Sequence, residues 1–169
     1  MGKGLRAVFV NHCHPDTKHV SALRMKSFAD ALAARGGKVV LLTETLTPAD
    51  ATRPVAQTVH DLNVHDWSRP FILAAPPTGS ELLQKAREGN LPFGLRQGVL
   101  AGAYFFRSGV FTDWLEGARP YLPVLAKTFR PQIVWGTFGN TDAWNISRCL
   151  ARLSGCPWAA DLKDNWSAF

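Results

Sequence analysis

The chain is poor in cysteine and has no long apolar run. Its three cysteines, Cys13, Cys149 and Cys156, include no Cys-x-x-Cys unit and cannot all pair within one chain, which argues against a disulfide framework or a structural zinc site. No apolar run reaches the roughly 20 residues that cross a bilayer, and the first residues lack the order of a secretory signal. We therefore expect a cytoplasmic protein in a reducing compartment.

Acidic residues are scarcer than basic ones. With 19 Lys and Arg against 13 Asp and Glu, the formal net charge is +6. A positive field of this kind concentrates nucleic acid, anionic membrane surfaces or phosphorylated substrates. The basic residues are nevertheless scattered, with no run of them, which is typical of a solvated surface. We therefore do not expect nucleic acid among the partners.

Common phosphate-binding and nucleophile motifs are also missing. Gly2-Lys3-Gly4 precedes the first predicted strand, and no Ser or Thr follows Gly37-Lys38 as a P-loop requires. A Gly-x-Ser-x-Gly elbow is absent, so an α/β-hydrolase would lack its nucleophile. His12, Cys13 and His14 are neighbours on an extended segment, where side chains alternate between faces, and we therefore expect no metal site.

Buried strands alternating with helices predict an α/β fold. At 169 residues, 46% of them hydrophobic, the chain suits one sizeable core and is too short for two full-sized domains. Residues 5–10 and 39–42 are short apolar runs, as in parallel strands buried on both faces. Between them, residues 19–35 have helical spacing and stop at a glycine pair, which completes a right-handed βαβ unit. We expect this helix to bury Val20, Leu23, Phe28, Ala31 and Leu32.

The remainder continues the pattern after an excursion. Residues 45–80 contain many chain breakers around a short apolar run, and residues 81–109 have mixed helical character interrupted by glycines. A helix broken by Pro120 and Pro123 then precedes a strand at 132–135. A final helix, capped by residues 140–142, should bury Ala143, Ile146, Leu150 and Leu153 before the last strand begins at Pro157. We predict a Rossmann-like, doubly wound, mostly parallel sheet with helices on both faces.

Two loops follow predicted strands at the carboxyl edge, where open α/β sheets bind ligands. The first includes Pro15, Asp16, Thr17 and Lys18, and it opens a helix whose N–H groups and dipole favour an anion such as a diphosphate. A Pro-Asp turn that only caps the helix explains the same residues equally well.

The second loop spans residues 136–141. Its glycines, including Gly139, allow a ligand to approach the backbone, and Asn140 or Thr141 could bond a hydroxyl-rich ligand. Helix capping is an equally good interpretation of Asn140.

The exit from the last predicted strand has the most specific pattern. Asp161, Lys163 and Asp164 together leave the carboxyl end of this strand, which we expect to be buried, between Trp158 and Trp166. These charges could form a structural ion pair. Grouping them at the ligand edge of a sheet is nevertheless costly unless they hold something charged or polar, so the pattern favours a functional site.

Several segments together carry a resemblance to a known family. They are the Phe-Val-Asn end of the first strand, His14-Pro15-Asp16, residues 28–43, residues 130–135 and residues 155–166. The last contains the motif Pro-Trp-x-x-Asp-x-[Arg/Lys]-Asp-x-Trp, which is much more specific than the others. With these segments the chain resembles the N-terminal domain of family 4 glycosyltransferases, and residues 45–125 have no detailed match.

The resemblance implies one half of a GT-B enzyme. Residues 1–169 would be the N-terminal, acceptor-side domain, and the nucleotide-sugar-binding C-terminal domain would be absent from the chain. The family transfers a sugar with retention from a nucleotide-sugar co-substrate, without a metal or other cofactor, to a glycan or lipid-linked acceptor in polysaccharide or glycoconjugate biosynthesis. The isolated chain is then expected to be inactive.

The resemblance also implies roles for individual residues. Lys163 matches a basic catalytic residue near the reacting sugar, and Asp161 and Asp164 would orient it or bond sugar hydroxyls. The sequence departs from the family in having Lys rather than the usual Arg at 163 and no adjacent glycines in the first loop. The predicted substrate-binding set is Pro15, Asp16, Thr17, Lys18, Gly139, Asn140, Thr141 and Trp166.

Other functions are compatible with the same fold class. A flavodoxin-like protein would use these strand ends to bind a flavin or nucleotide, and a sugar-nucleotide epimerase half would act on the donor alone. Residues 99–111 are apolar and aromatic, which raises the alternative that the domain contacts the inner face of a membrane rather than packing this segment on its core.

Overall fold

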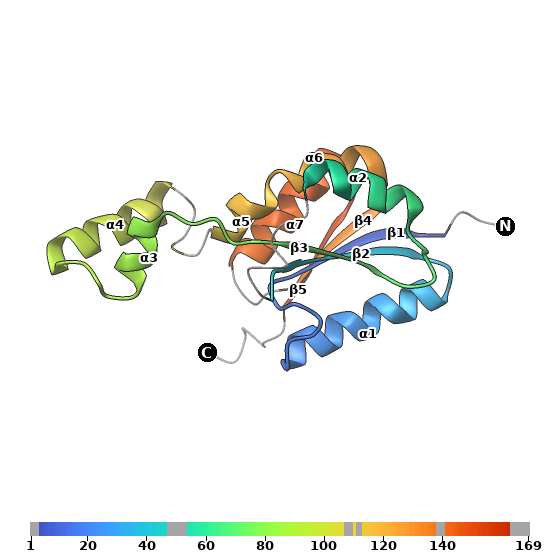
Figure 1. The fold of residues 1–169 in the computed structure, drawn as a ribbon, viewed down its shortest axis with the longest axis horizontal. Coiled ribbons are helices and arrows are strands. Elements are labelled where there is room, and N and C mark those ends of the chain that lie inside the picture. Colours follow the sequence, from blue (N-terminus) through green and yellow to red (C-terminus); the bar gives the residue numbers. More distant parts are fainter. Residues whose placement is uncertain (1–3, 47–53, 107–109, 111–112, 138–140, 163–169) are drawn as a thin grey trace.

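A parallel sheet of five strands lies at the centre of the molecule (Figure 1). The computed structural model describes residues 4–46, 54–106, 110, 113–137 and 141–162. All neighbouring strands in the sheet run parallel, which confirms the predicted Rossmann-like α/β fold. The strands are β1 (Arg6–Asn11), β2 (Lys38–Glu44), β3 (Phe71–Ala75), β4 (Ile133–Thr137) and β5 (Trp158–Asp161).

The strand order is β3-β2-β1-β4-β5. From β1 the chain winds to one side through β2 and β3, and it returns on the other side of β1 as β4 and β5. The winding therefore reverses between β1 and β4, whose carboxyl ends flank the crevice where such sheets bind ligands. A flavodoxin-like sheet has the order 2-1-3-4-5, so the order observed here is a different one.

Helices cover both faces of the sheet (Figure 1). On one face, α1 (Val20–Ala34) packs Met25 and Ala29 against alternate residues of β1 and β2, such as Phe9 and Leu41. On the other face lies the larger cluster, which includes Val8 and Leu42 of the same strands. Because side chains alternate along a strand, each strand contributes to both cores. The covering helices of the second face are α2 (Val55–Val64), α5 (Asp113–Ala118), α6 (Tyr121–Val124), the π-helix η2 (Leu125–Phe129) and α7 (Thr141–Ser154).

The predicted inner face of α1 is wrong. Val20, Leu23 and Phe28 are 77%, 59% and 43% exposed. Apart from Met25, the residues that lie against the sheet are small, and their size lets the helix backbone approach it closely. Ala31 is also exposed and Leu32 is half-buried. The buried residues of α1 are Ser21, Ala22, Met25, Ala29 and Ala33.

Two details at the end of the chain also differ from the prediction. In α7, Ala143, Ile146 and Leu150 are buried as expected, but Leu153, in the last turn of the helix, is 55% exposed. The last strand is not a buried one: β5 pairs with β4 at the edge of the sheet, and Trp158 is 38% exposed. An edge strand has a neighbour on one side only, which leaves its other side open.

The predicted helical excursion is a hairpin that projects from the sheet (Figure 1). It consists of α3 (Glu81–Arg87) and α4 (Phe93–Phe106), which pack on each other rather than on the sheet. An ion pair between Arg87 and Asp113 connects the hairpin to α5. Within the described residues, no helix is both long and apolar enough to cross a membrane.

We predict that Gly136→Ala destabilises the protein by about 1–3 kcal/mol, a usual cost of overpacking. A Cβ atom built on Gly136 in β4 would lie 2.2 Å from Oγ and 2.8 Å from Cβ of Ser147 in α7, so strand and helix would have to move apart. Urea denaturation followed by circular dichroism measures the effect.

Gly98→Ala in α4 is the matched control. A Cβ atom there meets nothing within 4 Å, and alanine has the higher helix propensity. This variant should unfold at the same or a higher urea concentration. A Gly136→Ala protein as stable as the parent would contradict the close contact between β4 and α7.

Candidate functional site

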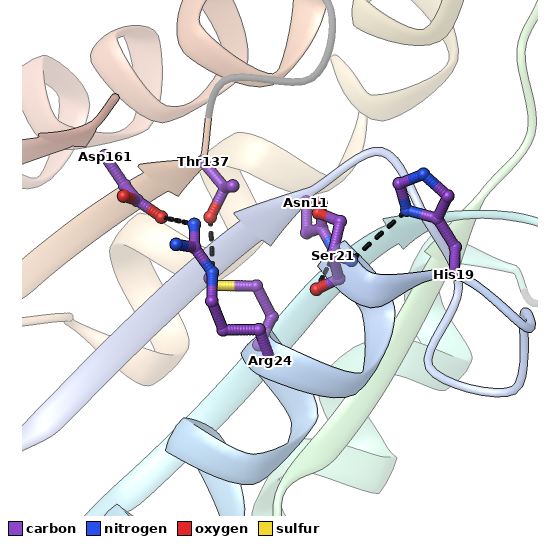
Figure 2. Close-up of polar contacts among 7 residues, drawn as sticks. Asn11, His19, Ser21, Arg24, Thr137 and Asp161 are labelled. Atoms are coloured by element: carbon purple, nitrogen blue, oxygen red, sulfur yellow. Dashed lines mark hydrogen bonds and ion pairs between the residues drawn. The ribbon is translucent and has the colours of Figure 1, made fainter. Parts of the chain in front are cut away.

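The carboxyl end of β1 is held by a buried amide. Asn11 is fully buried, and its Nδ2 donates to the carbonyl oxygens of Ser21 at 3.2 Å and Cys13 at 3.3 Å. The Ser21 hydroxyl donates back to Asn11 Oδ1 at 2.9 Å (Figure 2). Because one side chain bonds both the loop after β1 and the first turn of α1, it fixes how the chain enters the helix.

An ion pair lies beside this clamp. Arg24, one turn further along α1, pairs with Asp161 at the carboxyl end of β5 (Figure 2). Their side chains are 34% and 15% exposed, so the contact is only partly solvated. At the end of β4, the buried Thr137 hydroxyl donates to Met25 Sδ at 2.9 Å. These contacts join α1 to the ends of β4 and β5 across the crevice.

Asp161 thus lies at the predicted edge, but its partner was not predicted. The sequence suggested contacts between Asp161 and nearby charges, whereas the structure pairs it with Arg24, which is 137 residues away. Only the arrangement of α1 beside β5 brings the two together. Lys163, Asp164 and Trp166 lie outside the described residues.

The first predicted loop forms a turn at the crevice. The Thr17 N–H donates to the His14 carbonyl at 2.9 Å, and the Asp16 N–H donates to His14 Nδ1 at 3.2 Å. Pro15 is buried and Thr17 half-buried, whereas the side chains of Asp16 and Lys18 are exposed to solvent. His19 caps α1 by accepting the Ser21 N–H at 3.2 Å. The backbone of this loop therefore forms the turn before α1 that was one of the two interpretations of the sequence. The exposed side chains of Asp16 and Lys18 remain available to a ligand.

The expected divergence of His12 and Cys13 is wrong. Cys13 Sγ lies 3.1 Å from His12 Nε2 and 3.5 Å from His19 Nδ1. The chain bends immediately after β1, so strand alternation no longer applies at these residues. His14 faces Asp16 instead, with 3.6 Å between Nδ1 and Oδ2. No group of three or more His, Cys, Asp or Glu side chains in the described part of the chain could hold a metal ion.

The second predicted loop is described only at its ends. Gly136, expected to leave room for a ligand, instead leaves room for Ser147 of α7. Thr141 is exposed as the first residue of α7, next to the crevice. Gly139 and Asn140 lie outside the described residues.

A cleft of about 340 Å³ opens at the same edge of the sheet. It lies where β2, β3 and β4 end and where the α3–α4 hairpin leaves the sheet. The cleft is lined by Glu44, Pro77, Gly79, Gln84, Arg87, Asp113, Trp114 and Asp142.

Asp142 is the buried carboxylate of this cleft. It lies in the first turn of α7 but caps a different helix: its Oδ2 accepts the N–H groups of Trp114 and Leu115 at 3.0 Å each, at the start of α5. Its Oδ1 has no hydrogen-bond partner among the described residues. Burial raises the pKa of Asp142 to about 6, against the opposing effect of the two N–H donors.

Comparisons with protein-family models, with curated proteins and with solved structures found no match to this chain. Its function therefore has to be inferred from the residues and geometry of the carboxyl edge.

We predict that Asp142→Asn removes a pH dependence of stability. Folded Asp142 keeps its proton up to about pH 6, whereas the unfolded residue loses it near its ordinary pKa of 3.8. Between these values the unfolded state binds fewer protons, so the free energy of unfolding falls as pH rises, by on the order of 2–3 kcal/mol. Asparagine keeps an acceptor without the charge, so the variant should gain stability relative to the parent from pH 4 to 7 in urea denaturation.

Asp30→Asn is the control, because it makes the same change at an exposed carboxylate of α1 that pairs with Lys26. A parent–variant difference for Asp142→Asn that stays constant between pH 4 and 7 would show that burial does not oppose ionisation there.

Proposed function

We propose that this chain is the acceptor-side domain of a retaining glycosyltransferase that moves a sugar from a nucleotide-sugar donor to a glycan or lipid-linked acceptor. No metal or other cofactor is part of the proposal. The observation that carries it is the pairing of Arg24 with Asp161 at the carboxyl edge, because Asp161 belongs to the most specific motif of the sequence. The proposed location is the cytoplasm, at the inner face of the membrane.

The electrostatics of the crevice suit a departing diphosphate. When a nucleotide diphosphate leaves a sugar, negative charge develops on its oxygens, and fixed cations and helix N-termini stabilise it. Arg24 lies near the start of α1, and Lys18 lies in the loop before that helix. Lys163 follows Asp161 in the sequence. Asp161 accepts from only part of the Arg24 guanidinium, which has five N–H donors in all, so donors remain for a ligand.

The neighbouring cleft suits a hydroxyl-rich acceptor. Carboxylate and amide side chains such as Asp113, Asp142 and Gln84 accept or donate hydrogen bonds to sugar hydroxyls, and Trp114 adds an apolar surface. The cleft shares the carboxyl edge with the crevice, so an acceptor there would lie on the same side of the sheet as the donor phosphates.

The strand order also supports this class over the flavodoxin-like alternative. The order β3-β2-β1-β4-β5 is that of nucleotide-binding Rossmann sheets, which place the ligand phosphates between the first and fourth strands. The Arg24–Asp161 pair lies beside that point.

The projecting hairpin supports contact with a membrane that presents a lipid-linked acceptor. In α4, Phe93, Phe105 and Phe106 are 77%, 76% and 89% exposed. The helix has 14 residues with Arg96 as its one charged side chain, and at about 21 Å it is long enough to lie in an interface and too short to span a bilayer. The positive net charge of +6 favours an anionic surface.

We predict that Lys163→Ala in the full-length protein lowers kcat for sugar transfer by on the order of 100-fold, the usual effect of losing one group that stabilises developing charge. Unfolding temperature should change little. A radiolabelled nucleotide-sugar transfer assay, run with thermal unfolding of the same preparations, measures both quantities.

Lys127→Ala is the matched control, because it removes the same charge from an exposed lysine at the opposite edge of the sheet. It should leave kcat unchanged. Near-normal turnover by Lys163→Ala would refute the assigned role, and donor turnover without an acceptor would favour an epimerase half instead.

We predict that the chain sediments with vesicles of phosphatidylglycerol and phosphatidylcholine, and that changing both Phe105 and Phe106 to Ser lowers the bound fraction at least about tenfold. Removing each buried phenylalanine ring from the interface costs roughly 1.5–3 kcal/mol. Val64→Ser is the control, since Val64 is a 67% exposed apolar residue on α2, away from the hairpin. Absence of sedimentation by the parent, or equal sedimentation by both variants, would contradict the membrane contact.

A further inference from the structure

Three side chains that can exchange protons meet where β1 ends. Cys13 Sγ lies 3.1 Å from His12 Nε2 and 3.5 Å from His19 Nδ1, and the two imidazole rings are 6.2 Å apart between centroids. Cys13 and His12 are both half-buried. The proposed sugar transfer uses none of these side chains, and none of them is explained by packing of the sheet.

The hydrogen bonds assign a role to each imidazole. His19 Nδ1 already accepts the N–H of Ser21, so in the neutral ring this nitrogen carries no proton. A thiol has one proton to give, and His12 Nε2 is the nearer acceptor. Transfer of that proton leaves a thiolate on Cys13 and an imidazolium on His12, which attract each other.

Two further features favour the thiolate. His19 is the N-cap of α1, a helix of 15 residues, so Sγ lies near the positive end of the helix dipole. Asn11 holds the Cys13 carbonyl at 3.3 Å, which keeps the residue in place. A nucleophile, a base in contact with it and a fixed backbone are the parts that an activated cysteine requires.

We propose that Cys13 is a nucleophilic thiol, activated by His12, that is the site of modification by hydroperoxides and other small electrophiles. With a hydroperoxide, the sulfur attacks one oxygen: the S–O bond forms, the O–O bond breaks, and the leaving oxygen takes the proton from His12. The sulfur is oxidised to a sulfenic acid and the peroxide is reduced to an alcohol or water. This inference does not depend on the glycosyltransferase proposal.

The other two cysteines provide internal references. Cys149 is exposed on α7, so it serves as the reference for an accessible thiol. Cys156 is half-buried, and burial raises the pKa of its thiol. At pH 7 an ordinary cysteine is only a few per cent thiolate, so an activated one should react at least about tenfold faster.

The test is competitive alkylation of the intact protein with limiting iodoacetamide at pH 7, with each cysteine quantified by peptide mass spectrometry. We expect Cys13 to react at least about tenfold faster than Cys149, although Cys149 is the more exposed. Repeating the reaction in guanidinium chloride should bring the ratio close to one. In a parallel sample, hydrogen peroxide followed by dimedone should label Cys13 in preference to the other two.

Variants distinguish the effect of the His12 imidazole on Cys13 from an effect on folding. His12→Gln should lower the rate at Cys13 about tenfold, whereas His14→Gln, in the same loop, should not. His19→Asn keeps a side-chain cap for α1, and we expect it to lower the rate at Cys13 less than His12→Gln does. Equal rates at Cys13 and Cys149 in the native parent would overturn the proposal, even if a variant failed to fold. So would an unchanged rate in folded His12→Gln.

Discussion

The geometry of the carboxyl edge of the sheet depends on one buried side-chain amide, which needs hydrogen-bond partners. Asn11 ends the central strand with no exposure to solvent, and a buried amide without partners costs on the order of 1–3 kcal/mol. It meets that need by bonding the carbonyls of Cys13 and Ser21 and accepting the Ser21 hydroxyl. The chain therefore has to bend at once after β1 and start α1 beside it. Arg24 comes to face Asp161, and Cys13 comes to face His12, as consequences of this geometry.

Much of the fold could be read from the sequence because parallel strands leave a simple pattern. Short apolar runs marked β1, β2 and β4, and the stop at Gly36-Gly37 marked the end of α1. The inner face of α1 could not be read in the same way, because hydrophobicity favours large residues while close packing on a sheet favours small ones. Ala22, Ala29 and Ala33 are buried for the second reason.

The candidate site was predicted only in part, since local pattern reveals positions and not distant partners. Asp161 was identified from the strand exit, but Arg24 is separated from it by 137 residues and carries no motif of its own. Asp142 was expected to cap its own helix, yet its carboxylate caps α5, a contact that only the packing of α5 against α7 creates. Cys13 and His12 were expected to point to opposite faces of an extended segment, but the chain bends after β1 and brings their side chains into contact.

The hairpin of α3 and α4 is inserted between β3 and α5 without joining either core of the sheet. Ala103 is the one residue of α4 that is buried. Substitutions on the rest of this helix therefore leave the packing of the sheet unaltered, so natural selection can change what the hairpin touches independently of the fold. The protein in this way separates the part that must stay constant from a part that is free to diverge.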